Sequence, residues 1–185
     1  AAGLLLFEGK AMCSACHPSE PDEINGLRLF TDFSFDNLGV PKNPLNPFYD
    51  MDEVFLDDGS PINPDGADWV DYGLGGFLES HENPLWADMA PENMGKHKVP
   101  TLRNVGKANG NNFPKAYMHN GVFKSLKEVV NFYNTRDVLP WPPPEVADNV
   151  NTDELGNLGL TAEEEDAIVA FMETLSDGYD LKKNK

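Results

Sequence analysis

The sequence predicts a mainly α-helical domain with long loops, on three observations. Apolar residues recur at helical spacing near the start of the chain and again in two segments of its second half. Glycine and proline number 16 and 15 among 185 residues, so much of the chain is expected to be loop. Hydrophobic residues make up 40% of the chain, which is enough for a packed core in a chain of this length. We therefore expect residues 1–185 to form a single domain.

The first expected helix leads into the two cysteines of the chain. Leu4, Phe7 and Ala11 recur at helical spacing, and residues 13–17 then read C-S-A-C-H. This C-x-x-C-H pattern is typical of an attachment site for a c-type haem. Residues three and four apart share one face of a helix. Both thiols can therefore form thioethers to the haem vinyl groups, while the histidine offers its imidazole to the iron.

Two other kinds of site also use paired cysteines. A thioredoxin-like redox pair requires a βαβ context, and no strand pattern precedes Cys13. A structural zinc site needs four ligands, and the sequence has no second C-x-x-C. The sequence therefore predicts one covalent haem c, attached to Cys13 and Cys16, with His17 as the proximal iron ligand.

Compartment and charge restrict the partners. Thioether attachment takes place outside the cytoplasm, so we expect a periplasmic or otherwise exported protein whose signal peptide is already removed before Ala1. The chain has 14 Lys and Arg against 31 Asp and Glu, and this net charge of −17 argues against nucleic acid and an anionic membrane surface as partners. No apolar run is long enough to span a bilayer.

Basic residues are concentrated in one stretch. Residues 93–127 hold seven Lys and Arg and no acidic residue, whereas residues 29–95 hold 14 acidic residues and Lys42 as the single base. Such a block is often a solvated face. Alternatively it surrounds the haem edge, where it would offset the propionate charge and guide an acidic partner.

Residues 34–93 are expected to be a long insertion, rich in Pro, Gly and Asp, that wraps the core and shields the haem. A loop of this length in a compact domain needs anchors. Its many Asp residues raise the alternative of bound calcium, but none of them matches the calcium-loop template, so an exposed acidic loop is the stronger expectation. The aromatic residues that can serve as anchors are Phe48, Tyr49, Phe55, Trp69, Tyr72, Phe77 and Trp86.

Two further helices are indicated in the second half of the chain. Each begins at a capping box, Ser125 with Glu128 and Thr161 with Glu164. The connection between them, residues 140–144, reads PWPPP and is expected to be extended and rigid. The apolar stripes that follow the two boxes are Leu126, Val129, Val130 and Tyr133, and then Ile168, Phe171, Met172 and Leu175.

A helix ending in C-x-x-C-H, a loop-rich middle and an amphipathic last helix suggest a class I cytochrome c-like fold with long loop insertions. More specific stretches are FTDFSFDNLGVP (30–41), KVPTLRNV (98–105), YMHNG (117–121), SLKEVVNFY (125–133) and LTAEEEDAIVAFMETLSD (160–177). In this order they resemble the bacterial cytochrome c peroxidase/MauG family. The resemblance is to the C-terminal haem domain of that family and covers nearly the whole chain.

The chain departs from this family in one respect. Family members are dihaem enzymes, in which one haem meets peroxide and the haem of the C-terminal domain relays electrons. This chain has a single C-x-x-C-H. It is therefore expected to be either a single-haem relative or a fragment of a dihaem chain. The resemblance implies the electron-relay role, whereas peroxidase activity does not carry over.

The ligand on the far side of the iron decides between electron transfer and catalysis. The resemblance points to Tyr133, fourteen residues after His119, where the peroxidases have a Met ligand and MauG a Tyr ligand. Tyr133 also shares the apolar face of its helix and is therefore expected to point inward. The alternative to iron ligation is a core tyrosine with a hydrogen-bonded hydroxyl. Met118 is the rival ligand, and its thioether would raise the potential. Met94, His97 and His119 are weaker candidates.

Arg103 lies in the T-L-R-N stretch and is expected to pair with a haem propionate, the alternative being an exposed surface arginine.

The main functional prediction is a periplasmic cytochrome that transfers electrons to or from a redox partner through a small, transient interface. One alternative is a peroxidase-like enzyme domain or fragment with an open iron site. Another is a sensor that binds a small ligand without turnover.

Overall fold

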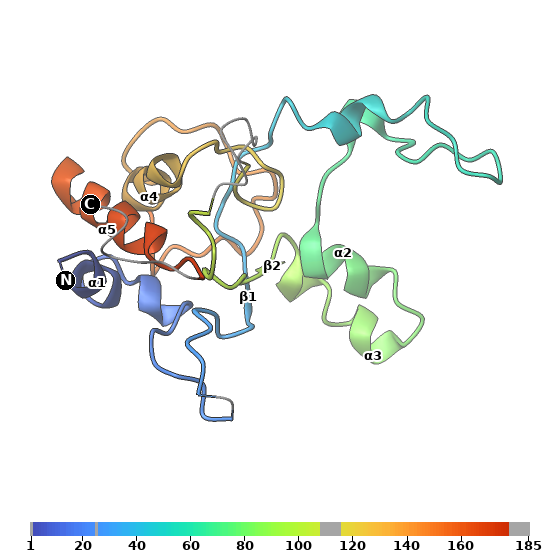
Figure 1. Cartoon of the computed structure of the whole chain (residues 1–185). Coiled ribbons are helices and arrows are strands. Elements are labelled where there is room, and N and C mark those ends of the chain that lie inside the picture. Colours follow the sequence, from blue (N-terminus) through green and yellow to red (C-terminus); the bar gives the residue numbers. More distant parts are fainter. Residues whose placement is uncertain (1, 25, 108–115, 178–185) are drawn as a thin grey trace.

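The computed structural model describes residues 2–24, 26–107 and 116–177 (Figure 1). The regular secondary structure is mostly helical with few strands, which confirms the predicted fold class. None of the helices in these ranges is long and apolar enough to cross a membrane. The α-helices are α1 (Ala2–Glu8), α2 (Gly73–Glu79), α3 (Pro84–Ala87), α4 (Leu126–Thr135) and α5 (Ala162–Glu173). The 3₁₀ helices are η1 (Cys13–Ala15), η2 (Pro47–Asp50), η3 (Gly66–Asp68) and η4 (Pro91–Asn93), and the strands β1 (Phe35–Asp36) and β2 (His97–Lys98) pair antiparallel.

The two long helices begin where the sequence predicts. Thr161 and Glu164 form the expected capping box at the start of α5. At the start of α4, the hydroxyl of Ser125 accepts the N–H of Glu128, but the Glu128 carboxylate accepts the N–H of Lys124, at 2.7 Å, rather than that of Ser125. Both arrangements satisfy N–H groups that have no partner inside the helix.

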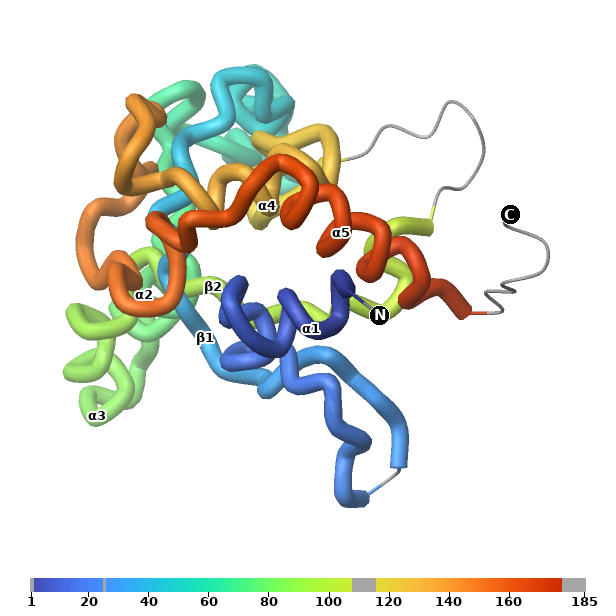
Figure 2. The backbone as a smooth tube through the Cα atoms, turned by 90° about the vertical axis from the view of Figure 1, so that its left-hand side faces the viewer, coloured from blue at the N-terminus to red at the C-terminus, as the bar shows by residue number. Residues whose placement is uncertain are grey.

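A close approach of α1 and α5 brings the two ends of the fold together, and Figure 2 shows the two helices side by side. Gly3 makes this approach possible, because a Cβ atom at this position would lie 2.0 Å from the carbonyl oxygen of Ala167. One turn later, the rings of Phe7 and Phe171 meet edge to face with centroids 5.1 Å apart. The residues that follow α1 are thereby held against the C-terminal helix.

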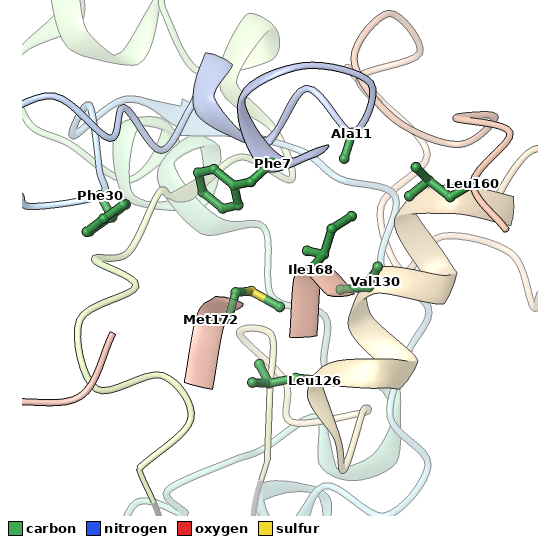
Figure 3. Close-up of a cluster of buried hydrophobic side chains, with 8 residues drawn as sticks. All are labelled: Phe7, Ala11, Phe30, Leu126, Val130, Leu160, Ile168 and Met172. Carbon is green, nitrogen blue, oxygen red and sulfur yellow. The ribbon is translucent and has the colours of Figure 1, made fainter. Parts of the chain in front are cut away.

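The main hydrophobic core lies where α1, α4 and α5 meet. Figure 3 shows its buried side chains turned toward one another from these helices and the adjoining loops. Phe7 and Ile168 are completely buried. The members of this core are Phe7, Ala11, Phe30, Leu126, Val130, Leu160, Ile168 and Met172.

The segment 34–93 contains short helices rather than uninterrupted loop, namely α2, α3 and the 3₁₀ helices η2, η3 and η4. At α3, the Asn83 side chain accepts the N–H of Leu85 and Pro84 takes the first helical position, a favourable start for a short helix. Figure 1 shows much of this segment on the side of the molecule away from α1 and α5. Part of it, within residues 36–40, lines the cavity described below. Its role in wrapping the haem stays a prediction.

Candidate haem-binding site

The C-x-x-C-H segment faces a cavity of 380 Å³, which Cys13, Cys16 and His17 all line. The 3₁₀ helix η1 begins at Cys13, directly after Met12, which has a left-handed backbone with φ of 55°. The N–H groups of Cys16 and His17 both bond to the carbonyl oxygen of Cys13, the second at 2.9 Å. This tight turn places two thiols and an imidazole at one cavity, as the attachment of a c-type haem requires.

The imidazole of His17 is anchored in the state that suits a metal ligand. Its Nδ1 lies 2.8 Å from the carbonyl oxygen of Phe30. Because a carbonyl only accepts, Nδ1 carries the proton and Nε2 keeps its lone pair. Burial lowers the pKa of His17, and the hydrogen bond to Phe30 and the charge of Asp32 offset only part of this effect. A neutral imidazole with one nitrogen held by a carbonyl oxygen is the usual form of a metal-ligating histidine.

The two thiols are not poised as a redox-active pair. Burial raises the pKa of Cys13 to about 12. Burial also raises the pKa of Cys16 to about 12, with further contributions from the negative charges of Glu154 and Asp36. Reactive cysteine pairs need a lowered pKa, because the thiolate is the nucleophile. The surroundings of the pair therefore disfavour the thioredoxin-like alternative.

The remaining wall of the cavity is mostly apolar. Such a wall suits a flat macrocycle with a large apolar surface, and two thiols with a neutral imidazole are the donor set for covalent haem c. The residues that are present therefore fit this group. The apolar lining residues are Phe7, Ala11, Met12, Leu38, Val40, Val99, Pro100, Leu102, Val105, Met118, Leu126, Val129, Val130, Leu155, Ile168 and Met172.

Tyr133 and Met118, the two leading candidates for the second axial ligand, line the same cavity. Tyr133 projects from α4, and burial together with the nearby Cys13 and Cys16 holds its pKa far above the ordinary value. Its hydroxyl is therefore a neutral phenol in these surroundings. Met118 has a left-handed backbone with φ of 68°. Met94 is not among the described residues that line the cavity.

Arg103 lies apart from this group. Its guanidinium donates a hydrogen bond to Asp177 at 3.0 Å, and it is not among the described residues that line the cavity. The hydrogen bond from Asn104 to the same carboxylate, at 2.9 Å, joins the T-L-R-N stretch to the end of the C-terminal helical region. The pairing of Arg103 with a propionate stays a prediction.

A polar cluster at the cavity is not apparent from the sequence. His97 and His119 both line the cavity, and their rings are stacked with centroids 3.7 Å apart and an interplanar angle of 6°. Nε2 of His119 lies 3.3 Å from the carboxylate of Glu145, which is 2% exposed. Asp71 completes the cluster, since its carboxylate lies within 4.8 Å of ligand atoms of both histidines. These residues come from four separate segments, so no local pattern joins them.

No family model matches the chain. The chain is 34% identical over 178 residues to the methylamine utilization protein MauG of Paracoccus denitrificans, with 89% of this chain and 39% of that protein covered. It is 33% identical over 178 residues to the cytochrome-c peroxidase IdrP1 of Denitromonas iodatirespirans, with 94% and 39% covered. The curated relatives are therefore much longer than this chain.

Solved structures of similar fold are also longer than this chain. The diheme peroxidase BthA of Burkholderia thailandensis matches with a TM-score of 0.64 and 27% identity, over 96% of this chain and 42% of that chain. A MauG-like protein associated with microbial copper homeostasis matches with a TM-score of 0.56 and 22% identity, over 95% of this chain and 46% of that chain. This second match shows similarity of fold alone.

The fold and its cavity define a cytochrome c-type haem domain. The chain is a homologue of the cytochrome c peroxidase/MauG family, as the sequence resemblance predicts. It spans 39% of the length of these two relatives, which corresponds to one haem domain.

Proposed function

We propose that this chain is the haem domain of a peroxidase-type enzyme of the cytochrome c peroxidase/MauG family. The observation that carries the proposal is the single cavity shared by Cys13, Cys16 and His17, on a fold similar to that of a diheme peroxidase. The names of the relatives favour an enzyme domain over a stand-alone electron carrier. One covalently attached haem c would supply redox chemistry at its iron, and the same iron would react with peroxide if the protein left it accessible.

The residues of the chain have separate tasks in this proposal. Cys13 and Cys16 would attach the haem through thioether bonds, and Nε2 of His17 would hold its iron. The carbonyl oxygen of Phe30 fixes the orientation of the imidazole and makes it a stronger donor. The mostly apolar walls make the cavity less polar than water, which strengthens the electrostatic effect of each charged group that lines it.

Tyr133 separates two versions of this function. Burial holds the pKa of its phenol far above the ordinary value, and a neighbouring ferric ion would favour loss of the phenolic proton. If Tyr133 held the iron of a bound haem, the domain would exchange electrons only. This is the second candidate function, a His/Tyr-ligated cytochrome, and the position of Tyr133 on the cavity wall favours it. If Tyr133 did not hold the iron, the haem would be able to react with peroxide.

Two measurements on the purified protein test the proposal. Low-temperature EPR of the ferric protein reports whether both axial positions are filled, and peroxide consumption with an electron donor reports catalysis. A high-spin signal with turnover supports the enzyme, whereas a low-spin signal without turnover supports the electron carrier. The chain should also be expressed in a host that attaches c-type haem. If it then carries no covalent haem, both the enzyme and the electron-carrier functions are refuted.

We also propose that the domain works in the periplasm with an acidic redox partner. Thioether attachment outside the cytoplasm supports the compartment. Lys98, a member of the basic block, is exposed and lines the cavity, so a positive charge lies at its edge. Electron exchange with the partner should then slow as the ionic strength rises, because salt screens exposed charges. A rate that is independent of salt would contradict this part of the proposal.

A further inference from the structure

We propose that Asp71, His97 and His119 bind a divalent transition-metal ion beside the haem cavity. Each residue offers one ligand atom, and the three atoms lie within 4.8 Å of one another. Two imidazoles and a carboxylate form a donor set that suits borderline ions such as Zn²⁺ and Cu²⁺. A hard ion such as Ca²⁺ prefers a shell of oxygen ligands, so the two ring nitrogens select against it.

The backbone holds the three segments in place. The N–H of Leu74 donates to the carbonyl oxygen of Lys96 at 2.8 Å. The N–H of Gly95 donates to the carbonyl oxygen of Tyr72 at 3.0 Å. These bonds fasten the segment of Asp71 to the segment of His97. One carboxylate oxygen of Asp71 accepts the N–H of Gly73 at 3.0 Å, which leaves the other oxygen for a metal.

His119 lies in a short turn that is fixed independently. The N–H of Tyr117 bonds to the carbonyl oxygen of Phe123 at 2.9 Å across this turn. Asn120 donates to the carbonyl oxygen of Pro41 at 2.8 Å and to the Glu145 carboxylate at 3.0 Å. The ligand atoms therefore belong to hydrogen-bonded segments that hold them within 4.8 Å of one another.

Glu145 has the position of a carboxylate that supports a metal ligand. Its Oε2 lies 3.3 Å from Nε2 of His119, so a carboxylate holds one nitrogen of this ring. Metal-bound histidines usually show this arrangement, in which the carboxylate fixes the ring and raises its basicity. The charges of Asp71 and Glu145 also sum to the charge that balances a divalent ion.

Tyr49 supplies a separate observation. Tyr49 is 8% exposed, and its hydroxyl, which faces the side chains of Asn46 and Glu145, makes no hydrogen bond of good geometry with a described residue. The hydroxyl lies within electrostatic reach of Glu145 and Asp71. A buried hydroxyl without a partner is unfavourable. A water molecule completing the coordination of the ion would provide that partner.

The test is equilibrium dialysis of the holoprotein against Zn²⁺, with zinc and iron measured separately. We expect one zinc per chain with unchanged iron, and at least about tenfold weaker zinc binding in His97→Gln, His119→Gln and Asp71→Asn. Glu145→Gln should weaken binding by about 10–100-fold, as for other carboxylates that support a histidine ligand. His81→Gln is the matched control and should bind zinc normally, since the His81 ring packs at a tilt against Trp86, outside the cluster. Ca²⁺ should not compete.

Two results would overturn the proposal. One is a holoprotein that binds no zinc, and the other is zinc binding that is equal in His81→Gln and in a His97→Gln/His119→Gln double variant. His97 and His119 also line the haem cavity, so their variants could lose haem. Asp71 and Glu145 are not among the described residues lining it, so normal zinc binding by both Asp71→Asn and Glu145→Gln with haem retained would equally refute the site.

Discussion

The carbonyl oxygen of Phe30 accepts a hydrogen bond from Nδ1 of His17 at 2.8 Å. Phe30 has a positive φ of 50°, which is uncommon for a bulky residue. Its ring is buried in the core, where it meets Phe7 and Phe171 with centroids 6.3 Å away in each case. The packed side chain thus stabilises a backbone conformation that directs the carbonyl oxygen to the predicted iron ligand.

This relationship predicts chemical rescue of His17→Gly. The variant should keep covalent haem, because both cysteines remain, but its iron should lose the proximal ligand. Added imidazole should restore the ligand, since the vacated space still contains the Phe30 carbonyl oxygen as an acceptor. EPR and absorbance spectra of the ferric protein, recorded with and without imidazole, measure the effect. A spectrum that His17→Gly leaves unchanged would show that another residue is the proximal ligand.

Replacing the two cysteines should abolish covalent haem attachment, whereas replacing Ser14 between them should not. Cys13→Ala/Cys16→Ala should lose covalent haem completely, because no thiol remains to form a thioether. Ser14→Ala is the matched control, since the Ser14 hydroxyl bonds only to the carbonyl oxygen of Glu8, at 3.3 Å, among the described contacts. Mass spectrometry of the denatured chain measures the attached haem directly. Haem retained by the double variant after denaturation would contradict the assignment.

Tyr133→Phe separates the two versions of the proposed function. If the phenol ligates the iron, the variant should change a low-spin ferric EPR signal to a high-spin one and should bind cyanide or peroxide faster. Met118→Leu keeps the volume of the neighbouring candidate and should leave the signal unchanged. The opposite pattern, with an effect of Met118→Leu alone, would make Met118 the ligand. If neither variant alters the spectrum, both residues are part of the wall only.

The parts of the site that the sequence predicts are those set by local spacing. The C-x-x-C-H turn needs only five consecutive residues, and the capping box at Thr161 and Glu164 needs four. The side-chain environment of the site depends on residues that are distant in the chain. Glu154 lies 3.8 Å from the Cys16 sulfur across 138 positions, and no pattern of sequence indicates that contact. The same holds for the partnership of Arg103 with Asp177.

Short helices show a second limit of the sequence. Residues 73–79 contain three glycines, which have low helix propensity. They form α2 because tertiary contacts require it. A Cβ atom at Gly75 would lie 2.5 Å from the backbone of Met94, so this face of the helix rests directly on the chain before β2. Tertiary packing therefore overrides the low helix propensity of glycine in a segment that the sequence predicts to be loop.

Glu165 should make the fold sensitive to acid. Its side chain is buried, which by itself raises the pKa, but hydrogen bonds from Asn134, Asn131 and Lys127 outweigh burial and hold the pKa below its ordinary value of 4.5. A carboxyl with a depressed pKa in the folded state contributes stability that is complete above its pKa in the unfolded chain. This contribution is lost as the pH falls from there through the folded-state pKa.

Replacement of this carboxyl should reduce the pH dependence. Glu165→Gln should lower the free energy of unfolding at pH 7 by about 1.5–3 kcal/mol, the range for hydrogen bonds to a charged group. Its stability should then fall less steeply than that of the wild type below pH 5. Glu163→Gln, an exposed position on the same helix, should keep the wild-type slope. Urea titrations at a series of pH values measure both slopes, and parallel curves for the wild type and Glu165→Gln would refute the prediction.

The core and the cavity share residues, so packing and cofactor site should be coupled at Ile168. This side chain is completely buried in the main core and also lines the cavity. Ile168→Ala should destabilise the holoprotein by about 2–5 kcal/mol, because a buried branched side chain is removed and the surroundings relax only partly. Leu5→Ala, at a position that is 71% exposed on α1, should stay within about 0.5 kcal/mol of the wild type. Thermal unfolding of the two variants provides the comparison, and equal losses would mean that Ile168 does not support the core.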